Sequence, residues 1–136
     1  MFITVFQVQC RKVVTVLQPH GNLDGFSCGD LIAKAREVYK AGAWDILLDL
    51  SDTPYITYSG LLAVYNITAM LRGDEPNDPG MGWKALQAVY RSRGLGLQQH
   101  LKLLNPRPEV AEKLEREGFK QFLETYTDLY KAVVSF

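Results

Sequence analysis

One serine follows a buried apolar segment in a place where chemistry could occur. Residues 46–50 are almost wholly apolar, and after a short loop Ser59 and Gly60 open an apolar helix predicted over 59–71. In an open α/β sheet, sites form beyond the carboxyl ends of the strands. The N–H groups and the dipole of a helix N-terminus favour an anion there. A phosphate on Ser59 would be stabilised at that place and would add about two negative charges. The alternative is that Ser59 only caps the helix.

Three common catalytic spacings do not occur. The sequence holds no GxGxxG, GxxxxGK[ST] or HExxH motif. Neither His20 nor His100 has an obvious carboxylate beside it in sequence, and Cys10 and Cys28 lack the spacing of zinc ligands. We therefore expect a protein that is not an enzyme and holds no metal and no cofactor, with two buried or half-buried free thiols. A hydrolase with Ser59 as its nucleophile is an alternative.

Length and charge favour one globular domain over residues 1–136. The chain is 47% apolar, which suits a packed core. Its 15 basic and 15 acidic residues cancel, which removes the electrostatic case for a nucleic-acid partner. No apolar run approaches the length of a membrane helix, and the first residues lack the pattern of a signal peptide. We expect no membrane insertion and a cytoplasmic location.

Apolar patterning predicts strands that alternate with helices. The predicted strands are 2–8, 13–17, 44–50, 101–104 and 121–123, with Pro19 in a turn. The predicted helices begin at Ser27, with Asp30 completing a capping box, then at Ser59, at Asn105-Pro106 and at 128, where Thr125 or Thr127 would cap. The order β-β-α-β-α-(insert)-β-α-β-α predicts an α/β fold. It would have a mostly parallel sheet of about five strands, with four helices and an antiparallel opening pair.

Two segments lie outside this regular pattern. Residues 73–99 read as an insert made of a loop and a short helix that carries Trp83 and Tyr90. It is either a partner-binding element or a helix packed on the edge of the domain. The opening strand, Phe2 to Val8, is an uncapped edge that could pair with a second copy of the chain to make a homodimer.

Several short motifs, in order, resemble the STAS domain. This is the fold of bacterial anti-sigma factor antagonists and of the cytoplasmic domain of sulphate transporters. The resemblance covers residues 1–72 and 100–136, which is most of the chain. Its motifs are Gly21-Asn22-Leu23-Asp24, Leu48-Asp49-Leu50-Ser51, Tyr58-Ser59-Gly60-Leu61, residues 104–110 and Gly118-Phe119. The resemblance implies a STAS-like single domain over the whole chain.

The resemblance also implies a phosphorylation-controlled regulator. In the family, the second serine of a D-S-S-G motif is phosphorylated by a serine/threonine kinase of the ATP-binding type that is itself the anti-sigma factor. That serine corresponds to Ser59. Here Thr57 replaces the acid and Tyr58 the first serine, and Thr57 is an alternative acceptor. The implied partner-binding residues are Asp24, Tyr55, Thr57, Tyr58, Ser59, Gly60 and Leu61, together with the exposed side of the helix over 59–71.

Two other functions stay open. A STAS adaptor that is not phosphorylated could serve as a subunit of a signalling or transport assembly. A small-ligand module could bind a nucleotide or a lipid at the corner near Ser59 and Asp24.

Overall fold

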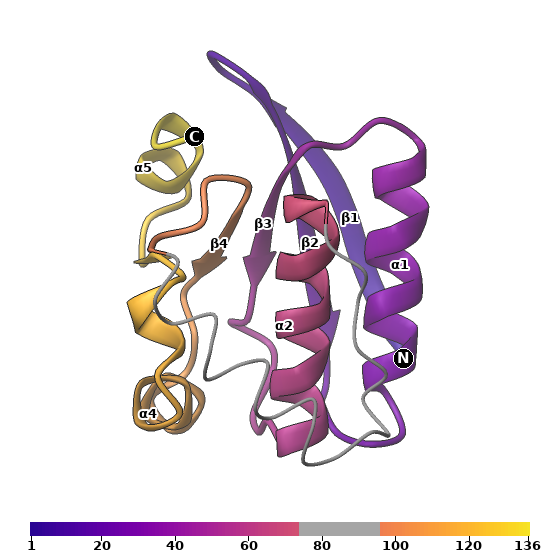
Figure 1. The fold of residues 1–136 in the computed structure, drawn as a ribbon, viewed down its shortest axis with the longest axis vertical. Helices are drawn as coiled ribbons and strands as arrows, with labels where there is room; N and C mark the ends of the chain where they lie inside the picture. The colour runs from indigo at the N-terminus through magenta and orange to yellow at the C-terminus, as the bar shows by residue number, and fades with distance from the viewer. Residues whose placement is uncertain (74–95) are drawn as a thin grey trace.

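The computed structural model describes residues 1–73 and 96–136, which form a mixed α/β fold around a five-stranded sheet (Figure 1). The strands lie in the order β1-β2-β3-β4-β5. Their bounds are β1 Phe2–Gln9, β2 Val13–His20, β3 Asp45–Asp49, β4 Leu101–Leu104 and β5 Thr125–Tyr126. β1 pairs antiparallel with β2 and every later pair is parallel, so the predicted topology is confirmed.

Four α-helices and one short 3₁₀ helix belong to the described residues. They are α1 Cys28–Lys40, α2 Tyr58–Arg72, α4 Pro108–Arg116, η3 Phe119–Gln121 and α5 Leu129–Val134. None of the helices described is long and apolar enough to cross a membrane. Most of the predicted insert, including Trp83 and Tyr90, lies outside the described residues.

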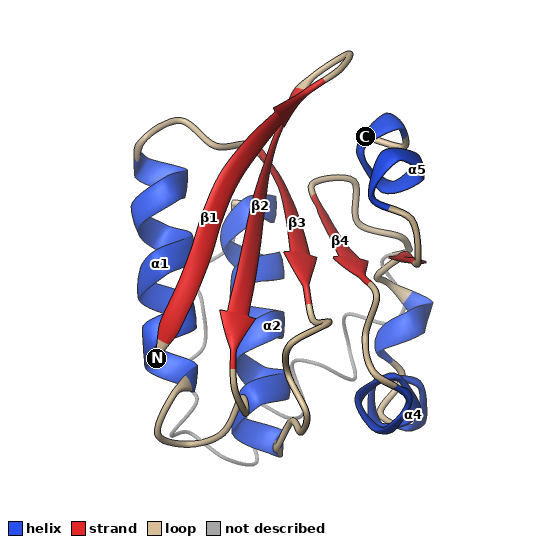
Figure 2. Cartoon of the chain, turned by 180° about the vertical axis from the view of Figure 1, so that it is seen from behind, coloured by secondary structure: helices blue, strands red, loops and turns tan. Residues whose placement is uncertain are grey.

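Helices cover both faces of the sheet, and this explains the continuous apolar run of β3. Figure 2 shows α1 and α2 behind the strands. On the other face, Ala132 and Val133 of α5 form a second core with Leu47. Ile46 and Leu48 belong to the core under α1 and α2, whereas Leu47 belongs to the smaller core under α5. Each of the three side chains is 0% exposed. A strand that is buried on both faces cannot alternate apolar with polar residues.

α2 is buried along almost its whole length. Every residue from Gly60 to Leu71 is buried. The expected exposed side of this helix, offered as part of a partner surface, is therefore wrong. Only the first turn and Arg72 have access to solvent.

Two predicted strand limits are wrong. β2 continues through Pro19, which lies opposite Ile3, because β3 pairs with β2 only as far as Leu17. Proline has no N–H to donate, but at position 19, beyond Leu17, this removes no hydrogen bond to β3. Residues 121–123 are not a strand, and the last strand is Thr125–Tyr126. The rings of Phe119 and Phe122, 5.1 Å apart, are both buried at a spacing of three, which a helical turn allows and a strand does not.

Three helix caps differ from prediction. The Ser27 hydroxyl makes no cap bond, because it donates to the Asn22 carbonyl at 2.7 Å, inside the preceding turn. Arg107, not Asn105, is the N-cap of α4, with Pro108 in its first turn. Asp128 caps α5 by accepting from the Lys131 N–H at 3.2 Å.

The two cysteines are both free thiols, as expected, but they differ in exposure. Cys28 is buried at the start of α1. Cys10 is exposed in the β1–β2 turn, contrary to the expected burial.

Candidate functional site

Two loops are joined at the carboxyl end of the sheet. They are residues 21–27, between β2 and α1, and residues 50–57, between β3 and α2. Leu23 and Ile56 form an isolated parallel bridge, and both side chains are buried. The Leu23 N–H donates to the Tyr55 carbonyl at 3.0 Å, and the Thr57 N–H donates to the Leu23 carbonyl at 2.9 Å. This pairing fixes where α2 begins.

Thr57, not Ser59, caps α2. The Thr57 hydroxyl accepts from the Gly60 N–H at 3.4 Å, and it also donates to the Leu23 carbonyl at 3.4 Å. The alternative that Ser59 only caps the helix is therefore wrong. Ser59 is the second helical residue and is half-buried, in the first turn where N–H groups lack intrahelical partners. The Thr57 hydroxyl is thus engaged in two contacts within the fold.

Gly60 allows this close approach. A Cβ built at residue 60 would lie 2.5 Å from the Leu23 carbonyl oxygen and 2.6 Å from Ile56 Cγ1. Both distances are shorter than van der Waals contact. The glycine that follows Ser59 is therefore required for steric reasons, because a residue without a side chain lets α2 lie against the loop that holds Leu23.

The Ser59 hydroxyl lies beside Gly25. A Cβ at residue 25 would be 3.8 Å from Ser59 Oγ, with nothing else within 4 Å. The neighbouring Asp24 carboxylate accepts from the N–H groups of Phe26 at 2.9 Å and Ser27 at 3.1 Å, so it holds the turn in shape. The Phe26 side chain is 98% exposed. Ser59 therefore lies beside Gly25, and the next residue of that turn, Phe26, is fully exposed.

Two exposed tyrosines of the β3–α2 segment lie against α4. Tyr55 and Tyr58 are 52% and 55% exposed. The Lys113 ammonium lies 5.2 Å from the centre of the Tyr55 ring and 4.8 Å from that of the Tyr58 ring, within range of cation–π attraction. The Tyr58 hydroxyl donates to Glu117 Oε1 at 3.2 Å. The sequence analysis missed Lys113 and Glu117. The charged residues of a helix do not indicate which loop will pack against them.

The predicted site residues come together, but they divide by exposure. Leu61 is 2% exposed and Gly60 is buried, so both shape the site from within. Tyr55 and Tyr58 are exposed, and Asp24, Thr57 and Ser59 are half-buried.

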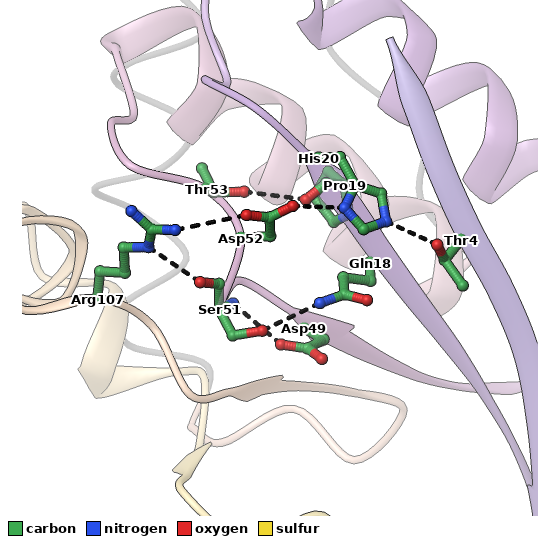
Figure 3. Close-up of polar contacts among 9 residues, drawn as sticks. All are labelled: Thr4, Gln18, Pro19, His20, Asp49, Ser51, Asp52, Thr53 and Arg107. Atoms are coloured by element: carbon green, nitrogen blue, oxygen red, sulfur yellow. Dashed lines mark hydrogen bonds and ion pairs between the residues drawn. The ribbon is translucent and has the colours of Figure 1, made fainter.

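A second polar cluster lies at the same end of the sheet (Figure 3). His20 Nδ1 is 2.5 Å from Asp52 Oδ2, and its Nε2 is 2.6 Å from the Thr4 hydroxyl. Arg107 donates from Nε to the Ser51 carbonyl at 2.9 Å and lies 3.4 Å from Asp52 Oδ1. This chain of contacts ties β1, β2 and the start of α4 to the β3–α2 loop. Its members are about 16 to 56 residues apart in sequence, beyond the range of local patterns.

The second histidine, His100, also lies beside a carboxylate in the fold. His100 Nδ1 lies 2.9 Å from Asp45 Oδ1, at the opposite end of β3 from Asp52. Within residues 1–73 and 96–136, no cluster of three or more His, Cys, Asp or Glu side chains is arranged to hold a metal ion.

Comparison with known proteins gives matches in structure only. No family model matches the chain, and no curated protein sequence matches it either. A candidate anti-sigma factor antagonist from Thermotoga maritima superposes with a TM-score of 0.66 at 17% identity, covering 89% of this chain and 85% of that one. An anti-sigma factor antagonist from Mycobacterium paratuberculosis gives 0.61 at 18% identity, over 98% and 93%. The phosphorylated form of the Bacillus cell fate determinant SpoIIAA gives 0.57 at 16% identity, over 98% and 97%.

The strand order, the helices on each face and these superpositions lead to one conclusion. The chain has the STAS fold of the anti-sigma factor antagonists.

Proposed function

We propose that the chain is a non-enzymatic, cytoplasmic regulatory module of one domain that needs no cofactor. It binds a partner protein through the Ser59 surface, which we define as Phe26, Tyr55, Tyr58, Ser59 and Lys113. The observation that carries this proposal is the position of Ser59, in the first turn of α2, next to the exposed Tyr58 in the chain and beside Gly25, whose neighbour Phe26 is also exposed. Aromatic residues dominate the energetic centres of protein interfaces. The partner is an anti-sigma factor that is also an ATP-dependent serine/threonine kinase.

Phosphorylation of Ser59 weakens the complex. The Ser59 oxygen forms a bond to the γ-phosphorus of ATP, the bond to the β-phosphate oxygen breaks, ADP leaves, and the hydroxyl proton passes to a base of the kinase. The dipole of α2 stabilises the phosphate within this chain. The same phosphate places about two negative charges among rings that a partner must cover. Loss of binding releases the sigma factor from its inhibition by the partner.

The structural neighbours support this proposal without testing it. Three of the solved chains are anti-sigma factor antagonists or candidates for that role, and one of them was solved in a phosphorylated form. The replacement of the usual acid by Thr57 has a physical role here, because its hydroxyl caps the helix that carries Ser59.

The experiment measures phosphorylation and affinity with matched variants. The tagged chain is purified with its anti-sigma partner and incubated with ATP, and peptides over 55–61 are read by mass spectrometry. We expect phosphate on Ser59, its loss in Ser59→Ala, and its retention in Thr57→Ser, which keeps the cap. Partner affinity of Ser59→Asp should fall roughly tenfold below that of Ser59→Ala, about 1.4 kcal/mol. Equal affinities would show that charge at this position does not control binding.

An unphosphorylated adaptor is the second candidate. The contact of Tyr58 with Lys113 and Glu117 favours it, because it holds a large ring beside the acceptor where a kinase must approach. Tight partner binding with an unmodified Ser59 would establish this function instead.

A further inference from the structure

We propose that the unpaired edge of β1 binds β1 of a second copy in antiparallel fashion. The pairing makes a two-fold homodimer with one continuous sheet across both copies. An ion pair between Arg11 of one copy and Asp30 of the other closes each end. This inference uses a surface separate from the Ser59 surface and does not depend on the proposed function.

β1 has the features of an edge made for pairing. All eight residues pair with β2, from Phe2 opposite His20 to Gln9 opposite Val13, and β1 is the outermost strand on its side of the sheet (Figure 2). Residues 2–9 contain no charge and no proline. Natural edge strands usually carry such residues, or a bulge, to prevent pairing between molecules. The absence of each protection along eight residues indicates that this edge is used.

Apolar side chains along the strand are left exposed. Phe2, Val5 and Phe6 are 72%, 40% and 39% exposed. Val8 packs on the core under α5, and Ile3 packs on the core under α1 and α2. Because successive residues of a strand alternate between faces, Phe2 and Phe6 lie on the face that carries α5. Covering these rings would supply the apolar burial that a pair of hydrogen-bonded edges alone lacks.

Symmetry sets the register. A two-fold axis perpendicular to the sheet places the same face of both copies on the same side of the joined sheet. The residue nearest the axis therefore pairs with the same residue of the second copy. An axis beside Phe6 places the two Phe6 rings together and sets Phe2 opposite Cys10 of the second copy. The next pair is Met1 opposite Arg11. This register engages the whole strand and gives roughly eight main-chain hydrogen bonds.

Opposite charges lie near the two ends of β1, and they favour a second copy of this chain, rather than another extended chain, as the binding partner of this edge. Arg11, in the β1–β2 turn, is exposed and has no ion pair within the residues described. At the other end, Asp30 Oδ2 accepts from the Met1 amino group at 2.8 Å, and its side chain is 54% exposed. The antiparallel register brings Arg11 of the second copy next to Met1 and hence next to Asp30. The same pair forms twice, once at each end.

The test measures mass by sedimentation equilibrium of the full chain over a dilution series. We expect twice the 15.3 kDa chain mass at high concentration. Phe6→Lys places two ammonium groups at the axis and should give a monomer. Val13→Lys is the matched control, because Val13 is similarly exposed, at 45%, but lies on β2. That variant should remain a dimer, and circular dichroism should show that both variants are folded.

Charge exchange then tests the ion pair. Arg11→Asp and Asp30→Arg should each weaken the dimer by roughly tenfold, and the double variant should recover most of the affinity. A monomer at every concentration would overturn the proposal. So would a dimer that Phe6→Lys leaves intact, since that dimer would use another surface. A double variant no tighter than the single ones would refute the Arg11–Asp30 contact.

Discussion

Replacement of Gly60 by alanine tests whether the two loops of the site depend on a close approach. The added Cβ would lie 2.5 Å from the Leu23 carbonyl oxygen, 2.6 Å from Ile56 Cγ1 and 3.0 Å from Leu23 Cβ. Two of the three contacts involve Leu23, which bridges to Ile56 and cannot swing away as a flexible side-chain end can. Relief requires the bridge or the first turn of α2 to move. Overpacking of this kind costs about 1–3 kcal/mol.

Helix propensity acts in the opposite direction, and a second glycine measures it. Alanine in place of glycine inside a helix gains about 1 kcal/mol. Gly29, within α1, would gain a Cβ that meets nothing within 4 Å, so Gly29→Ala should show this gain alone. Gly60→Ala should be destabilised by up to about 2 kcal/mol, which is the cost of the clash less the same gain.

Thermal unfolding followed by circular dichroism compares the two variants. We expect Gly60→Ala to melt below the wild type and Gly29→Ala above it, with melting temperatures roughly 4–12 °C apart. If Gly60→Ala proves as stable as Gly29→Ala, then the loop at Leu23 does not press on α2, and our account of the Ser-Gly motif is refuted.

Three further predictions concern caps and buried polar groups. Thr57→Val should cost about 1 kcal/mol in urea unfolding, because it removes the cap of α2 without changing volume. Lys102→Met should cost about 1–2 kcal/mol in the same assay, because the buried ammonium donates to Ser135 O at 2.9 Å and Oγ at 3.0 Å. The hydrogen bond to Glu124 raises the pKa of Tyr126 above the ordinary tyrosine value of about 10. Its stabilising contribution is therefore present below about pH 10 and lost as the pH rises through the folded pKa. Near-ultraviolet titration should show a late tyrosine ionisation that Tyr126→Phe removes.

Sequence patterns predicted the elements better than their ends. The apolar run of 46–48 predicted a strand buried on both faces, because only burial on both sides removes the need for alternation. The predicted capping box of the first helix failed because a serine before a helix can bond to its own loop instead. The Ser27 hydroxyl bonds to the Asn22 carbonyl, and local sequence does not record that choice. Residues 121–123 failed because packing between Phe119 and Phe122 prevailed over strand propensity.

The position of the site was predictable, but its contacts were not. A serine after a strand and at the start of a helix must lie near the carboxyl edge of the sheet. That Lys113 lies over Tyr55 and Tyr58 depends on how α4 packs beside the β3–α2 loop. The meeting of His20 with Asp52 depends on the length of β2, which the sequence underestimated by three residues, Gln18 to His20.

The Leu23 carbonyl links the start of α2, where Ser59 lies, to the rest of the fold. It accepts from the Thr57 N–H and from the Thr57 hydroxyl, and it is the atom nearest to a side chain at residue 60. If the proposed phosphate on Ser59 shifts the first turn of α2, it disturbs Leu23, and with it the turn that presents Phe26. Because Asp24 holds that turn through the N–H of Phe26, the negative charge of the proposed phosphate would act on the turn as well as on a bound partner. Under the proposed function, phosphorylation would thus change the shape of the Ser59 surface in addition to its charge.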